Sequence, residues 1–179
     1  MDYKHSQISI DSSANELVTL AELVDWLRIP SHTDEGMVKA LITAAHARVE
    51  QLINADLQAR QYILYLPSGQ STADLPRQHV ASIVDVSYYN SSNALSTYSM
   101  ANVYQVGNWV KLMETPNCYD RPDAIQITYA TALPESIKHT AKICVQMLVA
   151  TWYDNRADGK YAVPSAVEVM CGQIRSILV

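Results

Sequence analysis

The stretch AIQITYATALPESIKHTAKICVQMLVATWYDNR, residues 124–156, decides the fold, because the spacing of its apolar residues changes partway along it. Residues 124–129 (AIQITY) predict the last β-strand, and from Ile125 onward apolar and polar side chains alternate, which is typical of a half-buried strand. After Pro134, which suits the first position of a helix, apolar residues recur every three or four positions on one face. They are Ile137, Ala141, Cys144, Leu148 and Trp152. The stretch therefore predicts a strand followed by a long helix over residues 134–156.

A capping box marks the start of the first predicted helix. The Thr19 hydroxyl can accept a hydrogen bond from the amide of Glu22, and the Glu22 side chain can reach back. Pro30 stops the helix, since the residue before a proline avoids the helical conformation. We predict this helix over residues 19–28.

A second helix is predicted over residues 34–54, with Ser31 or Thr33 as its N-cap. Its apolar residues form one continuous stripe. They are Val38, Leu41, Ile42, Ala45, Val49, Leu52 and Ile53. The short link between the first two helices favours an αα-hairpin.

Residues 59–130 carry the signals of β-strands and turns. Segments rich in β-branched and aromatic residues lie at 62–66 and 80–89. The NSSN segment at residues 90–93 predicts a turn, because Asn tolerates left-handed backbone conformations, and Gly-Asn at 107–108 predicts a two-residue hairpin. We expect an antiparallel β-meander of about five or six short strands.

Pro164 opens a last amphipathic helix, predicted over residues 164–178. Its apolar residues are Val167, Met170, Ile174, Ile177 and Leu178. We therefore predict an α+β fold, in which a helical core of about four helices (α-α, then α-α) is interrupted by the antiparallel β-meander insert. Residues 1–17 are polar and are predicted to form a flexible N-terminal arm, and residues 18–179 a single domain.

Composition and charge limit the functions open to the chain. Its 179 residues are 49% hydrophobic, yet no apolar run approaches the roughly 18 residues of a membrane span. The N-terminal residues lack the pattern of a secretory signal, so we expect a cytosolic protein. A net charge of −5 disfavours a general nucleic-acid binder. Cys118, Cys144 and Cys171 have no C-x-x-C spacing, which disfavours a zinc ribbon, and the last two are predicted to be core residues.

No pattern predicts a catalytic, metal or cofactor site. His46 and Glu50 share a helix face, but a metal ion would need further ligands there. We interpret them as an exposed polar pair. Asp120 and Asp123 could act as paired carboxylates only if burial separated their pKa values. The Arg-Pro dipeptide between them is typical of a loop.

The end of the helix over residues 134–156 carries the densest cluster of polar and aromatic side chains. Trp152 and Arg156 are spaced i, i+4, so the guanidinium could lie over the indole. Alternatively, Arg156 could cap the helix by binding its terminal carbonyl groups. In both cases Trp152 and Arg156 are a structural anchor of the helix end. No nucleophile or base lies within a turn of them to support catalysis.

Tyrosine is frequent, with eleven residues, while phenylalanine is absent. Tyrosine is enriched at protein interfaces, although β-strands also favour it, and both explanations are open. We select candidate residues for a subunit or partner interface from the β-insert and the last two helices. They are Tyr88, Tyr89, Trp109, Tyr153, Met170, Ile174 and Ile177.

The order and spacing of several segments resemble the phage head–tail connector (adaptor) family over residues 18–179. The segment LRI at residues 27–29 precedes a long helix that contains LITAAHARVE at residues 41–50. LPRQHVASI and VSYY follow within residues 75–89. The resemblance is closest over residues 124–156. The chain departs from the family pattern at three places: His79, the turn at 90–93 and the Ala-Leu pair at 132–133. These departures concern the geometry of turns more than the fold.

The resemblance implies a structural virion protein that is not an enzyme and has no cofactor. Such connectors form a homo-oligomeric ring under the portal, for which twelvefold symmetry is expected. The ring extends the DNA channel and docks the tail or a stopper (terminator) protein. Passing DNA is not bound sequence-specifically, and no membrane is involved. The expected location is the virion neck at the head–tail interface, after assembly in the host cytoplasm.

Two other functions stay open. A DNA-packaging accessory or nucleic-acid-binding module needs a basic face, whereas residues 134–179 hold five basic against four acidic residues. A small hydrolase needs polar groups that converge in a pocket, and the sequence indicates none.

Overall fold

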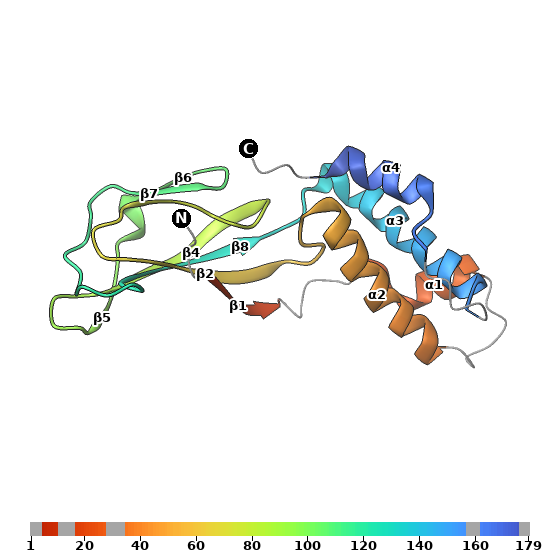
Figure 1. The fold of residues 1–179 in the computed structure, drawn as a ribbon, viewed down its shortest axis with the longest axis horizontal. Coiled ribbons are helices and arrows are strands. Elements are labelled where there is room, and N and C mark those ends of the chain that lie inside the picture. The colour runs from red at the N-terminus through yellow and green to blue at the C-terminus, as the bar shows by residue number, and fades with distance from the viewer. Residues whose placement is uncertain (1–4, 11–16, 28–34, 157–161, 176–179) are drawn as a thin grey trace. The chain divides into compact units, whose positions relative to one another are not determined.

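The computed structural model describes residues 5–10, 17–27, 35–156 and 162–175, the first of these segments as backbone only. These residues hold four α-helices and eight β-strands that pair antiparallel, so the predicted α+β class is confirmed. The chain divides into two compact units. Figure 1 labels the helices and strands that belong to them. Residues 1–14 and 58–132 make a β unit, and residues 15–57 and 133–179 make a helical unit.

The β unit contains two antiparallel sheets. Their strands are β1 (His5–Ile10), β2 (Arg60–Leu66), β3 (Thr72–Asp74), β4 (Val80–Tyr89), β5 (Leu95–Thr97), β6 (Val103–Val106), β7 (Trp109–Leu112) and β8 (Ile125–Thr131). A five-stranded sheet has the order β1-β2-β8-β4-β5, and a three-stranded sheet has the order β3-β7-β6. The predicted meander needs correction, because a meander pairs strands that are neighbours in the chain. Here the last strand, β8, lies between β2 and β4.

The central position of β8 follows from its pairing on both edges. It pairs with β2 over its whole length, from Arg60 opposite Thr131 to Leu66 opposite Ile125. On its other edge it pairs with β4, with two register shifts. Because β8 alternates buried and half-buried residues throughout, one of its faces lies in the core.

The core of the β unit is built from alternate residues of β2 and β8. Six of these side chains are fully buried: Tyr62, Leu64, Leu66, Ile125, Ile127 and Tyr129. The rings of Tyr62 and Tyr129 stack with their centroids 5.6 Å apart. The predicted turns are confirmed, since Asn93 and Gly107 have φ angles of 58° and 56°.

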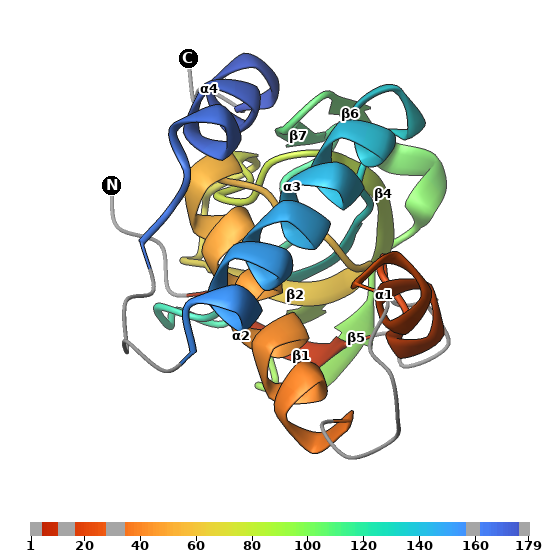
Figure 2. The same cartoon turned by 90° about the vertical axis from the view of Figure 1, so that its right-hand side faces the viewer.

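The helical unit consists of α1 (Leu20–Leu27), α2 (Glu35–Ile53), α3 (Glu135–Asp154) and α4 (Ser165–Ile174). Figure 2 shows α2 packed along α3, with α4 and α1 on opposite sides of α3. The predicted apolar stripes of α2 and α3 form the core of this unit. Their members are buried, except Leu52 and Ile137, which are partly buried.

The helix boundaries differ from the prediction by a few residues. Pro134 and Pro164 occupy the N-cap position and not the first helical position, because their ψ angles of 137° and 141° are extended. The Pro134 carbonyl still accepts the first helical hydrogen bonds. Helix α4 ends at Ile174, before the predicted end at residue 178. Ile177 and the predicted N-caps Ser31 and Thr33 lie outside the described residues.

The N-terminal region holds a strand where the sequence predicts a flexible arm. Residues His5–Ile10 form β1, which pairs antiparallel with β2 at the edge of the five-stranded sheet. The outer edge of β2 offers backbone N–H and C=O groups that an extended segment can bind whatever its side chains. Such pairing does not require a strong apolar pattern, and Ile8 and Ile10 are the only aliphatic residues of this strand. The single domain over residues 18–179 stays a prediction.

The capping box at the start of α1 is confirmed. The Thr19 amide donates to Glu22 Oε2 at 3.0 Å, and the Glu22 amide donates to Thr19 Oγ1 at 3.3 Å. Lys142 of α3 contacts the same carboxylate, with Nζ 2.6 Å from Oε1. The hydrogen bond from Lys142, followed by that from the Thr19 amide, lowers the pKa of Glu22. One side chain thus caps α1 and joins it to α3.

Replacing Glu22 with glutamine is expected to reduce the acid dependence of stability. The folded pKa lies below the ordinary value of 4.5, so the carboxylate's contribution is present above that value and is lost as the pH falls through the folded pKa. Because Glu22 is 43% exposed, the expected cost at neutral pH is only about 0.5–1 kcal/mol. Urea unfolding at neutral pH and at about pH 3.5 measures the free energy of unfolding of both proteins. The deficit of Glu22→Gln relative to the wild type should be smaller at the acidic pH.

Glu135→Gln is the matched control, because Glu135 is 84% exposed and pairs with Lys138 on its own helix. That change should have little effect at either pH. A Glu22→Gln deficit that is equal at both pH values would contradict the assigned role of the carboxylate.

Candidate interaction surfaces

Trp152 lies at the C-terminal end of α3, with 5% of its surface exposed. Its Nε1 donates a hydrogen bond to the carbonyl oxygen of Ala162 at 3.0 Å. Ala162 belongs to the segment that leads into α4. The indole therefore joins the end of α3 to the start of α4.

Arg156 binds the end of α3, but its guanidinium does not lie over Trp152. Nη1 donates to the carbonyl oxygen of Tyr153 at 2.7 Å, and the guanidinium lies 4.2 Å from the centroid of the Tyr153 ring. Helix α3 ends at Asp154, so the helical i, i+4 spacing does not extend to Arg156. Of the two alternatives from the sequence, the structure contains the capping contact.

The loop at residues 120–123 is held by contacts within the β unit. Arg121 makes two hydrogen bonds of 2.7 Å to the Asp123 carboxylate and lies 3.7 Å from the centroid of the Tyr89 ring. Asp120 accepts a hydrogen bond from Ser68 Oγ at 2.9 Å. The two carboxylates have separate partners, which agrees with the interpretation as a loop.

The other residues considered for chemistry also have structural contacts. Glu50 Oε1 accepts a hydrogen bond from the amide of Leu57, just beyond α2, at 3.0 Å. Cys144 and Cys171 are buried and hydrogen-bonded to each other, and this bond together with burial raises the pKa of Cys171. Among the described residues, no group of three or more His, Cys, Asp or Glu side chains could hold a metal ion. Within the same ranges, no helix is long and apolar enough to cross a membrane.

The β6–β7 hairpin presents an exposed apolar face, which we call the hairpin patch. It consists of Tyr104, Val106 and Trp109, whose exposed fractions are 52%, 55% and 37%. Val106 lies opposite Trp109, and the rings of Tyr104 and Trp109 meet edge to face with centroids 6.4 Å apart. Sequence reasoning selected only Trp109. The alternation on either side of Gly107 and Asn108 could have identified the other two, since residues two apart in a strand share a face.

Tyr88 and Tyr89 are candidates from the sequence that already contact other side chains in the β unit. The Tyr88 ring packs edge to face on Tyr98, with centroids 6.4 Å apart. The Tyr89 ring lies under the guanidinium of Arg121. They are less exposed than the hairpin patch.

The remaining candidates belong to the helical unit. Tyr153, Met170 and Ile174 are half-buried and pack against the helical core, so only part of each side chain could meet a partner. Ile177 is not among the residues that the structure describes.

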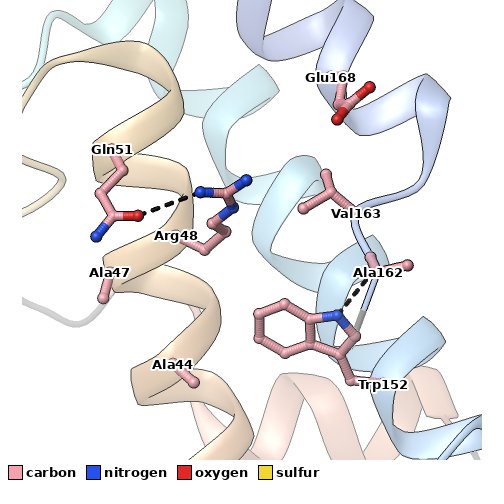
Figure 3. Close-up of a pocket in the computed structure, with 8 residues that line it drawn as sticks. All are labelled: Ala44, Ala47, Arg48, Gln51, Trp152, Ala162, Val163 and Glu168. Atoms are coloured by element: carbon pink, nitrogen blue, oxygen red, sulfur yellow. Dashed lines mark hydrogen bonds between the residues drawn. The ribbon is translucent and has the colours of Figure 1, made fainter. Parts of the chain in front are cut away.

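An open groove of about 630 Å³ lies between α2 and the start of α4. Its lining residues are Ala44, Ala47, Arg48, Gln51, Trp152, Ala162, Val163 and Glu168, as Figure 3 shows. Arg48 projects from α2 toward α4, and its Nη1 donates to Gln51 Oε1 at 3.3 Å. Glu168 stands on α4, on the opposite wall. The sequence could not predict this groove, because it depends on where α4 packs.

Helix α1 carries an exposed tryptophan that sequence reasoning also missed. Trp26 is 46% exposed, beside the exposed Asp25. The sequence alone could have placed Trp26 on the exposed side of the helix, because it lies outside the apolar stripe. That stripe consists of Leu20, Leu23, Val24 and Leu27. Trp26 therefore belongs to the exposed side of α1 and not to the helical core.

Comparison with known proteins gives one family and several similar structures. The family model for head completion protein (HCP) matches residues 16–167. A chain in the neck of an empty gene transfer agent (GTA) particle, computed with C6 symmetry, has a TM-score of 0.70 and 17% identity, covering 98% of this chain and 97% of that chain.

Two further structures share the fold. A chain in the neck of the native GTA particle, computed with C12 symmetry, has a TM-score of 0.67 and 18% identity over 100% of this chain and 97% of that chain. A chain in the virion of the native particle has a TM-score of 0.65 and 18% identity over 96% of both chains. No curated protein sequence matches this chain significantly.

Proposed function

This chain belongs to the head completion protein family and is a structural protein of the head–tail connection, and from this premise we propose that it is an adaptor of the virion neck. In that role, identical copies form a ring under the portal. The ring extends the DNA channel and docks the tail or a stopper protein. The family match over residues 16–167 carries this proposal, because it spans most of both compact units.

The symmetry of the similar structures supports a ring. Chains of the same fold occur in GTA necks computed with C6 and with C12 symmetry. We infer twelve copies for this chain, since a twelvefold ring is compatible with both symmetries. A closed ring joins two different faces of each copy, so every subunit needs two complementary surfaces.

The charge of the chain suits a channel through which DNA passes. Its net charge of −5 makes a tight grip on the phosphate backbone unfavourable. DNA can then slide through the ring without sequence-specific contacts. This role needs no catalytic group, metal ion or cofactor.

The hairpin patch is our candidate for a partner surface in the β unit. It has exposed apolar and aromatic side chains on one face of two strands, of the kind that are enriched at interfaces. Trp109 is its central candidate. Tyr88, Tyr89, Tyr153, Met170 and Ile174 are proposed to contribute through their exposed edges.

Native mass spectrometry and electron microscopy are expected to reveal closed rings of about twelve chains. Rings should form either from the purified chain alone or after addition of the portal protein of the same phage. A pull-down with the portal protein measures docking directly, and Trp109→Ala tests whether the hairpin patch takes part.

Two results would contradict the proposed function. One is a chain that forms no ring with or without the portal protein and is not retained by it. The other is tight DNA binding with a steep salt dependence, measured by gel shift, which would favour a nucleic-acid-binding module.

A further inference from the structure

We propose that α1 of one copy docks in the groove between α2 and α4 of the next copy, with Trp26 in the groove and Asp25 against Arg48. This inference rests on the ring proposed above and specifies the two faces that a ring needs. It concerns the helical unit alone.

The α1 side of this contact is an acidic helix face with one large apolar side chain. Ala21, Glu22, Asp25 and Trp26 are exposed and follow one another at i, i+1, i+4 and i+5, so they share one side of the helix. Residues 20–27 contain no Lys or Arg. Glu22 is already held by Thr19 and Lys142, which leaves Asp25 as the acidic group beside Trp26.

The groove has the size and lining to receive an indole. Its volume of about 630 Å³ lies within the range of about 300–1,000 Å³ typical of sites for drug-sized molecules, which exceed an indole in size. Ala44 and Ala47 form a wall of small side chains, which lets another helix approach closely. Val163 and the small exposed edge of Trp152 add apolar surface.

Arg48 supplies the charge that α1 lacks. Within the described part of the chain, its guanidinium makes one hydrogen bond, to Gln51, and the remaining N–H groups can bind a carboxylate. Glu168 on the opposite wall would repel an acidic helix. Asp25 must therefore face the α2 wall, which fixes the direction in which α1 enters.

A second copy is the occupant that these features favour. The groove and the exposed face of α1 differ in shape and charge, and α1 and α4 lie on opposite sides of α3 (Figure 2). One copy can thus use both surfaces at once, each with a different neighbour. That is the requirement for a head-to-tail contact that closes into a ring.

Charge reversal tests the contact under the conditions in which the wild-type chain assembles. Arg48→Glu and Asp25→Arg should each raise the concentration needed for ring formation by about tenfold or more. The double variant should restore assembly, because the reversed charges attract again. An equal mixture of the two single variants should also assemble if their copies alternate in the ring. The new glutamate at position 48 of one variant then meets the new arginine at position 25 of the other. In the next contact, the unchanged Asp25 meets the unchanged Arg48.

Two further variants separate the contact from general effects. Trp26→Ala should weaken assembly by a similar factor, because buried tryptophans dominate many interfaces. Lys39→Glu reverses a charge on an exposed position of α2 that does not line the groove, and it should assemble as the wild type does. Circular dichroism and thermal unfolding confirm that each variant is folded.

The outcomes distinguish this contact from the ring itself. Rings that form normally from Arg48→Glu and from Asp25→Arg overturn the contact and leave the proposed function intact. The contact is also overturned if the single variants are folded but form no rings, and neither the double variant nor the mixture restores assembly. A wild-type chain that forms no ring with or without the portal protein contradicts both proposals.

Discussion

Replacing Trp152 with alanine is expected to lower the free energy of unfolding by about 3–5 kcal/mol. The side chain is 5% exposed in the helical core, so its removal loses buried apolar surface and leaves a cavity. It also removes the hydrogen bond from Nε1 to the Ala162 carbonyl. Urea unfolding followed by far-ultraviolet circular dichroism measures the change, and the midpoint should fall at a similar m-value.

Two other variants divide this effect into its parts. Trp152→Phe keeps an aromatic ring but loses the hydrogen bond, and it should cost less than the alanine change. Trp26→Ala removes a tryptophan that is 46% exposed, and it should change stability by about 0.5 kcal/mol or less. Unchanged unfolding of Trp152→Ala would mean that the indole faces solvent or a partner instead of the core.

Replacing Tyr62 with alanine is expected to destabilise the β unit by about 3–5 kcal/mol. Tyr62 is fully buried in β2 and stacks on Tyr129, which lies opposite it in β8. The Arg77 guanidinium lies 4.8 Å from the centroid of its ring. The change therefore removes a ring that joins β2 to β8 within the five-stranded sheet, and urea unfolding measures its cost.

Tyr104→Ala is the matched control in the same unit. Tyr104 is 52% exposed on the hairpin, so its truncation should change stability by less than about 1 kcal/mol. Tyr62→Phe preserves the stacked ring and should keep most of the stability. A Tyr62→Ala variant that is as stable as Tyr104→Ala would show that the sheet does not depend on the stacked pair.

The helices could be predicted closely because their signals are local. The capping box of α1, the stripe of α2 and the switch from alternation to helical spacing before α3 each depend on residues within a few turns. The end of α4 was less predictable, since helix ends depend on contacts that spacing does not record.

The candidate surfaces were only partly predictable. Trp109 was selected, and the alternation around the hairpin turn contained enough information to add Tyr104 and Val106. Of the two alternatives for Arg156, the structure contains the helix cap and not the contact with the Trp152 indole, because the helix ends before Arg156 and its spacing no longer applies. Arg48 could not be recognised, because its position in a groove depends on α4, more than a hundred residues later in the chain.

Local sequence patterns were therefore enough to establish the α+β class, the four helices, the two turns and the order of the segments that resemble head–tail connectors. Only the tertiary structure decided that β8 lies between β2 and β4, that β1 extends the sheet, and that an open groove lined by Arg48 and Trp152 lies between α2 and α4. The physical reason is that strand pairing and helix packing join residues distant in the chain, and many pairings satisfy the same alternation. Spacing identifies the buried face of an element, whereas packing decides which other element covers it.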